Sequence, residues 1–312
     1  MEVTPIFFGN PAAQAQFAAK YKEFLEEWVE LQEAVRLVML NRTIFPPDMA
    51  RLESLPDDDP LVIAAEDRFK ADLSSFVLAR TAVDDFSELL TLASNGYGIG
   101  ALKTLRGMYE RIVTSAYVAL FPEVSRALID STWTHQWKVW RRATALRPAL
   151  ASTVDENEIE MLRERAEAAK VRHNESFCKH CGQLVQVHAW TKVDLDTMAQ
   201  KVDSRLAGQE LSLARLSDFY LRCYLQPTAL AHATGTSVNE KFENVDGQWT
   251  YKMDSSAELK QSLIFGHTLL LSLLAHQNRH FNYGLENILL PRNAALRRVW
   301  NLPPPDDTSM GQ

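Results

Sequence analysis

The fold class of this chain is decided by residues 17–38, which read FAAKYKEFLEEWVELQEAVRLV. Apolar side chains recur there at alternating spacings of four and three residues, at Phe17, Tyr21, Phe24, Trp28, Leu31, Val35 and Val38. This spacing places them on one side of a helix, as a heptad seam that must lie along a partner helix. Asn10 and Pro11 mark the helix start, because asparagine caps free N–H groups and proline suits the first helical position.

A second stretch, residues 61–94, repeats this spacing with Phe69, Leu73, Phe76, Val83, Phe86 and Leu90. Asn95-Gly96 supplies a helix stop after it, and prolines between residues 43 and 60 separate it from the first seam. We expect the two seams to pack as an antiparallel pair. With the helical patterns that follow, the sequence predicts an all-α fold, a multi-helix bundle of about eight or nine helices with a small irregular insertion that contains cysteine.

The second half of the chain contains three further signals. Residues 211–224 are helical in pattern, and Pro227 is expected to interrupt them. Asp246-Gly247, with Trp249 and Tyr251 alternating after it, predicts a small hairpin. Ser255 with Glu258 three residues later resembles a capping box for a central apolar helix over 259–281.

We expect one helical domain over residues 1–300, with a possible sub-boundary near residue 150. A small CxxC insertion interrupts it at 173–190, and a disordered tail follows at 301–312.

The composition of the chain limits the kinds of partner that we expect it to bind. The chain has 312 residues, 46% of them hydrophobic, and a net charge of −7, which argues against coating a phosphate backbone. Net charge therefore does not support a nucleic-acid partner, although a local basic groove would still permit one. We also expect a homo-oligomer. Three cysteines do not form a disulfide framework, and residues 1–10 contain no secretory signal, so we expect a cytoplasmic protein. The longest apolar run, residues 263–274, falls short of the roughly 20 residues that span a bilayer, so no membrane partner is expected.

The sharpest local motif is Cys178-Lys179-His180-Cys181-Gly182. Two thiolates at this spacing on a tight turn can occupy two corners of a zinc tetrahedron. We expect a structural zinc ion held by Cys178 and Cys181, with His173 and His188 as the further ligands. Other candidate ligands are His180 and Cys223, and the alternatives are a redox dithiol and a small loop without metal.

Four residues are candidates for catalysis. Arg106 and Glu110 are four residues apart and share a helix face beside apolar positions, where charges need a partner. Tyr224 and His232 flank Pro227, and small residues around His232 predict a buried imidazole. The simpler interpretation is a structural Arg106–Glu110 ion pair and a hydrogen-bonded core histidine.

The long apolar helix contains three further histidines. His276 and His280 have the spacing of a metal pair, but no glutamate lies between them, so we interpret them as an ordinary polar patch. His267 is the better candidate for a buried polar role.

Several short motifs together resemble a family. They are Leu105-Arg106-Gly107-Met108-Tyr109-Glu110, the cysteine pair, Ala189-Trp190, Asp196-Thr197-Met198-Ala199, and Tyr224 with Leu230-Ala231-His232-Ala233-Thr234. They are similar to bacterial proteins of domain-of-unknown-function family 5677, over about residues 61–280. The resemblance implies an all-helical cytosolic protein and brings no function with it.

A weaker resemblance is to the HEPN helical ribonucleases, which pair an arginine with a histidine four to six residues later. Arg172 and His180 have seven residues between them, and Arg222 and His232 have nine, so neither pair has the spacing of these ribonucleases.

We therefore expect an interaction or bacterial defence module with a structural zinc loop. The alternative is a HEPN-like ribonuclease or nucleotide-processing toxin of an anti-phage or stress system. In it Arg106 or Arg222 would stabilise phosphate charge, Tyr224 or His232 would transfer protons, and Glu110 would orient the arginine. Whether the chain is an enzyme stays open.

Overall fold

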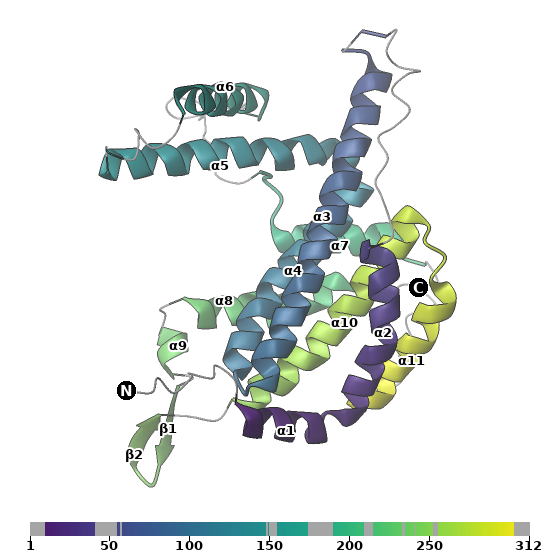
Figure 1. The fold of residues 1–312 in the computed structure, drawn as a ribbon, viewed down its shortest axis with the longest axis vertical. Coiled ribbons are helices and arrows are strands. Elements are labelled where there is room, and N and C mark those ends of the chain that lie inside the picture. Colours follow the sequence, from purple (N-terminus) through teal and green to yellow (C-terminus); the bar gives the residue numbers. More distant parts are fainter. Residues whose placement is uncertain are drawn as a thin grey trace, which may run out of the picture. The chain divides into compact units, whose positions relative to one another are not determined.

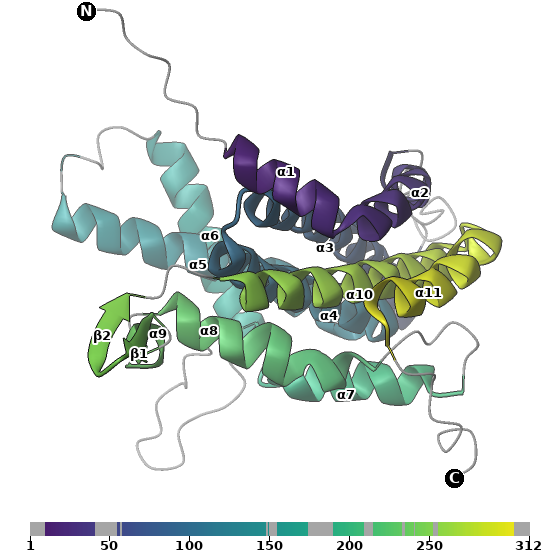
Figure 2. The same cartoon turned by 90° about the horizontal axis from the view of Figure 1, so that it is seen from below.

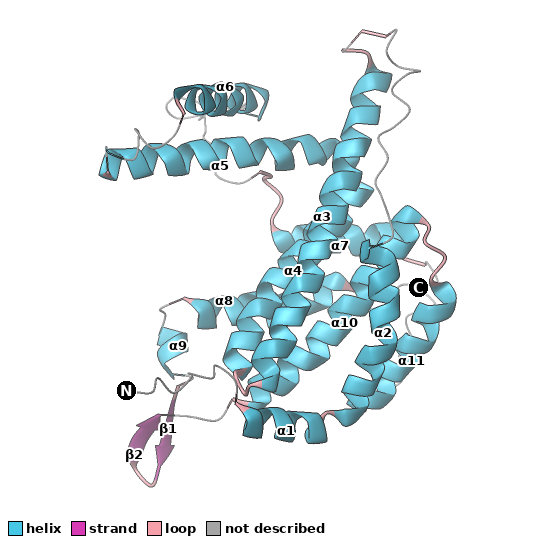
Figure 3. Cartoon of the chain, in the orientation of Figure 1, coloured by secondary structure: helices cyan, strands magenta, loops and turns pink. Residues whose placement is uncertain are grey.

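The computed structural model describes residues 10–40, 55–56, 58–147, 149, 155–173, 190–208, 215–232, 235–239, 241–251 and 255–302. These residues form helices and one small hairpin, so the predicted all-α fold is confirmed (Figures 1 and 3). The longer elements in chain order are α1 (Pro11–Lys20), α2 (Lys22–Leu40), α3 (Pro60–Ser94), α4 (Gly98–Leu120), α5 (Ser125–Leu146), α6 (Glu156–His173), α7 (Leu195–Leu206), α8 (Gln226–Ala231), α9 (Gly235–Asn239), β1 (Phe242–Val245), β2 (Gln248–Tyr251), α10 (Ser256–Phe281) and α11 (Glu286–Trp300). Two short 3-10 turns, η2 (Pro122–Val124) and η4 (Leu216–Phe219), and a π-helix, η5 (Tyr220–Leu225), lie between these elements.

The chain divides into two compact units. Unit 1 contains Met1–Thr43, Phe76–Tyr117 and Leu195–Gln312, and unit 2 contains Ile44–Ser75 and Val118–Asp194. Helices α3 and α4 contribute residues to both units. The predicted domain limits stay a prediction, and the tail from residue 303 lies outside the described residues.

The N-terminal seam is confirmed, but its helix is broken in two. Phe17, Phe24, Leu31 and Val38 are buried, as the heptad spacing predicts. The break falls at Tyr21, between α1 and α2, and Figure 2 shows the two helices meeting at an angle. Tyr21 is itself buried, with its ring centre 5.1 Å from that of Phe17. The start of α1 is as predicted, since the Asn10 side chain accepts a hydrogen bond from the Ala13 N–H.

Helices α1 and α2 run antiparallel to the later part of α3, as predicted. The backbone N–H of Asn10 donates to Asn95 Oδ1 at 2.8 Å, which joins the start of α1 to the end of α3. Further along, the ring centres of Trp28 and Phe86 lie 5.1 Å apart. Residue numbers rise along α1 and α2 while those of the α3 residues that they contact fall, so the helices run in opposite directions.

The buried face of α3 differs from the predicted seam. Apart from Phe86, the predicted residues are partly exposed, and Leu73 is 41% exposed. The helix instead buries a stripe of mostly small residues: Ala71, Ser75, Ala79, Ala82, Phe86, Leu89 and Ala93. Small side chains allow neighbouring helices to approach closely, which explains why they face the core. Apolar spacing predicted the helix correctly but its inward face wrongly.

Helix α10 is the central helix of unit 1, as predicted, with a continuous buried run from Gly266 to Ala275. A Cβ atom on Gly266 would lie 3.2 Å from a Leu89 methyl group, so glycine permits the close contact with α3. The predicted capping box is wrong. The Ser255 hydroxyl makes no capping bond to its own helix and donates to the Gly96 carbonyl instead. It also accepts from the Gly98 N–H at 3.1 Å, which fixes the start of α10 to the turn before α4.

The interruption predicted at Pro227 does not occur. Helical turns continue from η4 through the π-helix η5 into α8 (Figure 2). In η5 the backbone bonds join residues five apart, as between the Gln226 N–H and the Leu221 carbonyl. Pro227, which has no N–H to donate, lies in the first turn of α8, directly after the π-helix.

The predicted hairpin is confirmed as β1 and β2, an antiparallel pair in the register Phe242 opposite Tyr251 and Asn244 opposite Trp249. Asp246 and Gly247 form the two-residue turn with φ of 52° and 83°. Positive φ at both central residues is the geometry that asparagine or aspartate followed by glycine favours.

In unit 2, α5 and α6 pack along each other as a helical pair. This pair buries few apolar side chains completely: the buried residues are Ser125 and Asp130 in α5, and Ala166 and Ala169 in α6. The α5 tryptophans are half-buried, and the Arg165 guanidinium of α6 lies 4.5 Å from the centre of the Trp133 ring.

No single helix among the described residues is both long and apolar enough to cross a bilayer, although one bent pair, Gly98–Leu120 with Pro122–Leu146, passes on length and composition.

Candidate functional site

The Leu105–Glu110 motif of the family resemblance, with Arg111 directly after it, lies in the middle of α4 in unit 1. Leu105, Met108 and Tyr109 point inward and are fully buried. Arg106, Tyr109 and Arg111 contact other segments of unit 1. The motif is therefore where α4 is joined to α3, η4 and η5.

Arg106 lies over an aromatic ring from the π-helix. Its guanidinium carbon is 5.0 Å from the centre of the Tyr224 ring, a cation–π distance. Its Nη2 is 3.9 Å from Glu110 Oε2, so the expected ion pair is present. The Glu110 side chain is half exposed, and solvent therefore weakens that pair. Arg106 Nε is buried and donates to no acceptor in the described part of the chain.

Gly107 and Arg111 connect α4 to α3. The Arg111 guanidinium pairs with the carboxylate of Asp85, which is buried. Burial raises the pKa of Asp85, and the neighbouring Arg111 opposes that shift. A Cβ atom on Gly107 would lie 2.9 Å from Arg111 Nη1, so the glycine leaves room for the guanidinium to lie along α4.

Tyr109 connects α4 to the turn before the π-helix. Its hydroxyl donates to the Leu216 carbonyl at 3.0 Å inside the core, and burial raises the pKa of that hydroxyl. The Asp203 carboxylate of α7 accepts from the backbone N–H groups of Leu216 and Ser217 at 2.7 and 2.9 Å, which caps η4. Cys223 is fully buried in η5, and burial raises the pKa of its thiol, so it is an unreactive core residue.

His232 is not buried as predicted. It lies at the carboxyl end of α8 with its side chain exposed. Helix α8 ends at Ala231, so His232 follows the helix and does not lie within it. Among the four candidates for catalysis, the structure brings together Arg106, Glu110 and Tyr224. Their catalytic roles stay predictions.

His267 has the buried role that we expected of it. The imidazole is fully buried, and its Nδ1 accepts from Trp300 Nε1 at 3.1 Å. Its edge meets the Phe24 ring with centres 5.5 Å apart. Burial lowers the pKa of His267 to about 4, so the ring is neutral at pH 7. Burial also lowers the pKa of His276 to about 4, an effect that nearby Asp203 opposes.

The predicted zinc site cannot be placed. Cys178, Cys181 and His188 lie outside the described residues, as do His180 and the side chain of His173, the last residue of α6. In the described ranges no three His, Cys, Asp or Glu side chains are grouped closely enough to hold a metal ion. The structural zinc ion stays a prediction.

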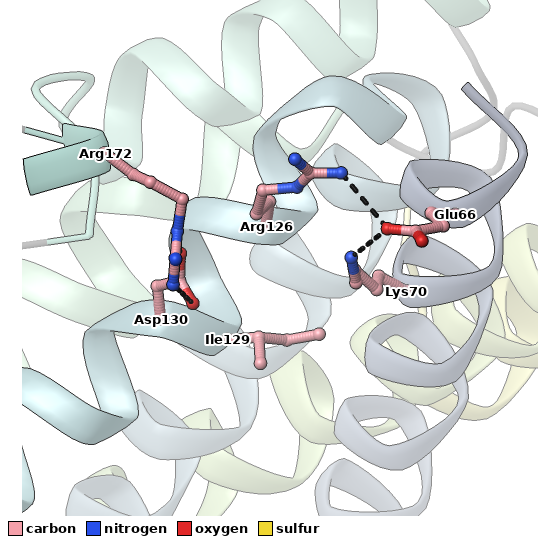
Figure 4. A pocket seen from close by; sticks show the side chains of 6 residues that line it. All are labelled: Glu66, Lys70, Arg126, Ile129, Asp130 and Arg172. Carbon is pink, nitrogen blue, oxygen red and sulfur yellow. Dashed lines mark hydrogen bonds and ion pairs between the residues drawn. The ribbon is translucent and has the colours of Figure 1, made fainter. Parts of the chain in front are cut away.

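Unit 2 contains a hollow of about 270 Å³ lined by charged side chains (Figure 4): Glu66, Lys70, Ile129, Arg126, Asp130 and Arg172. Arg172 donates to both carboxylate oxygens of Asp130, at 2.9 and 3.0 Å. Glu66 Oε2 accepts from Lys70 Nζ at 2.9 Å and pairs with Arg126 Nη2 at 3.3 Å. Each cation that lines the hollow faces a carboxylate, so we interpret the group as an ionic network that joins three helices of unit 2.

The hairpin has an uncovered aromatic face that the sequence reasoning did not identify as functional. Opposite residues of an antiparallel pair share a face, so Phe242, Tyr251 and Trp249 project to the same side. Phe242 is 45%, Tyr251 55% and Trp249 73% exposed. Large apolar side chains grouped on a surface mark an interaction site. The alternation of Trp249 and Tyr251 was the available signal, since a two-stranded hairpin has no second layer to cover such a face.

Comparison of the chain with models of protein families identifies the same family as the sequence motifs. The family model described as a family of unknown function, DUF5677, matches residues 74–248. The chain belongs to this family. The DUF5677 match includes the Leu105–Glu110 motif, the π-helix and the hairpin as far as Gln248, and the resemblance inferred from the motifs is confirmed. No curated protein and no solved structure matches the chain.

Proposed function

We propose that this DUF5677 protein is a binding module that recognises another protein through the aromatic face of its β1–β2 hairpin, defined by Phe242, Trp249 and Tyr251. The observation that carries the proposal is the exposure of three aromatic rings on one side of a two-stranded sheet. Isolated hairpins are marginally stable in water, and aromatic rings are enriched where proteins meet. A bound partner would cover both the rings and the sheet.

Catalysis finds less support in the described residues. Arg106 is held by Tyr224 and Glu110, and its guanidinium therefore acts as a packing group between α4 and η5. The exposed His232 lies at the end of a different helix. The ribonuclease alternative requires an arginine and a proton-transferring group at one reacting atom.

Site-specific photo-crosslinking in the cell of origin tests the proposal. A photoreactive phenylalanine analogue replaces Trp249 in one strain and Tyr97 in the control strain. Tyr97 is a matched control, because it is also an aromatic residue of unit 1 and is 57% exposed. We expect a discrete crosslinked protein product from position 249 and none from position 97. Absence of a product at position 249, or the same products at both positions, would contradict the proposal.

We further propose that the CxxC loop binds structural zinc through Cys178 and Cys181. Its support is the ligand spacing, and metal binding would supply folding energy to a loop that is too short to form a core of its own. Elemental analysis of protein purified without added metal is expected to give one zinc per chain, and none in the Cys178→Ser, Cys181→Ser double variant. A metal-free wild-type protein would overturn this assignment.

A further inference from the structure

The aromatic face of the hairpin already holds one cation. Lys241 Nζ lies 5.3 Å from the centre of the Tyr251 ring. The ring of Trp249 is the most exposed of the three, and an indole is the strongest cation–π acceptor among side chains. A lysine or arginine side chain from a partner can therefore stack on the Trp249 ring, as Lys241 does on the Tyr251 ring.

The charge of the hairpin segment favours the same ligand. Residues 240–254 contain four acidic and two basic residues, a net charge of 4 − 2 = 2 negative charges, and the whole chain has a net charge of −7. A chain with this net charge attracts a basic segment and repels nucleic acid and anionic lipid. It also repels a second copy of itself.

The backbone at the edge of the hairpin can form hydrogen bonds with a strand from another protein. Each strand of a two-stranded sheet has an outer edge, and an edge without protection is a template for another strand. Strand β2, Gln248–Tyr251, contains neither proline nor a charged side chain, two of the devices that block such pairing. Addition of a strand from a partner is an established mode of peptide recognition.

We infer that the partner segment is an extended strand of another protein in which basic and apolar residues alternate. Its backbone adds to the hairpin as a third strand, and a lysine or arginine side chain stacks on Trp249. This inference rests on the proposed binding function and names the chemistry of its ligand.

Binding of synthetic peptides to the purified full-length protein tests the inference. The probe is a seven-residue peptide in which lysine alternates with valine. One control peptide replaces lysine with glutamate, and another carries proline at its centre. Calorimetry is expected to detect binding of the lysine peptide alone.

Trp249→Ser should weaken the binding of the lysine peptide about tenfold or more, as expected for an aromatic residue at the centre of an interface. Tyr97→Ser should leave the affinity unchanged. Trp249→Phe, which keeps a ring, should retain binding within about threefold and controls for loss of hairpin folding.

Each other outcome overturns the inference. Equal binding of the glutamate peptide would show that recognition does not depend on positive charge. Equal binding of the proline peptide would show that the peptide does not bind as an added strand. Concentration-dependent dimerisation through Trp249, or binding of RNA at Trp249, assigns the face to another ligand. Absence of lysine-peptide binding also contradicts the inference, whereas a crosslinked protein at position 249 would leave the proposed function standing by itself.

Discussion

Unit 1 and unit 2 are stabilised by different interactions. In unit 1, α10 buries 15 of its 26 residues, most of them leucine and other apolar side chains. In unit 2, the buried residues of α5 are Ser125 and Asp130, and ion pairs around Arg126 and Arg172 join its helices. Apolar burial gives a stability that depends on packing, whereas exposed ion pairs contribute little each and are screened by salt. We therefore expect the two units to respond differently to cavities, pH and salt.

The largest effect should come from a cavity in unit 1. Leu102→Ala removes a fully buried side chain of α4 and should lower the free energy of unfolding by about 4 kcal/mol. Urea denaturation measures the change. Leu290→Ala, at a half-exposed position of α11, is the matched control and should change stability by less than about 0.5 kcal/mol. Equal losses in the two variants would contradict the assigned core.

Acid should weaken unit 1 through His267. Its pKa is about 4 in the folded protein and 6.5 in its ordinary state, so the folded state binds fewer protons between these values. The stabilising contribution is complete above pH 6.5 and is lost as the pH falls toward 4, by about 3 kcal/mol. Thermal melts from pH 7 to pH 4 measure the loss. His267→Gln should remove about half of this pH dependence, because the pKa of His276 is lowered to the same extent. An unchanged profile would show that His267 is not buried as described.

A smaller effect is expected from the ionic network of unit 2. Asp130→Asn leaves Arg172 without its carboxylate, but because that guanidinium is 45% exposed, the loss should be about 1 kcal/mol. Hydrogen exchange of α5 and α6 measures the change, which 0.5 M salt should mimic in part. Glu160→Gln breaks an exposed pair with Arg163 on α6 and should have no measurable effect. A large effect of the control variant would contradict the ionic account of unit 2.

The smallest effect on stability should come from the hairpin. Trp249 is mostly exposed, so Trp249→Ser should change the free energy of unfolding by less than about 0.5 kcal/mol. Urea denaturation beside the wild type measures this. A loss above about 2 kcal/mol would mean that the ring is a packing residue rather than a binding residue.

The sequence predicted the helices better than their contacts. Heptad spacing located α1, α2 and α3, but the inward stripe of α3 contains alanines such as Ala79, which apolar periodicity does not distinguish from surface alanines. The break at Tyr21 was missed because the heptad spacing continues through it, and the π-helix was missed as well. The turn at Asp246-Gly247 was predicted correctly because positive φ is a local requirement.

Part of the candidate site was also predicted correctly, because that part depends on local sequence spacing. The Arg106–Glu110 pair follows from helical spacing, whereas the contact of Arg106 with Tyr224 joins residues more than a hundred positions apart. The exposure of His232 depends on where α8 ends. The aromatic face was overlooked because a pattern of alternating residues does not tell whether a second layer covers it.

Hydrogen exchange of the full-length protein with the lysine–valine peptide tests the central claim most directly, namely that binding occurs at the hairpin and not at the Arg106 cluster. With the peptide at about ten times its dissociation constant, exchange across residues 242–251 should slow by roughly tenfold. Exchange across residues 105–111 and 220–225 should stay unchanged. Protection at α4 and η5 with none at the hairpin would contradict the account.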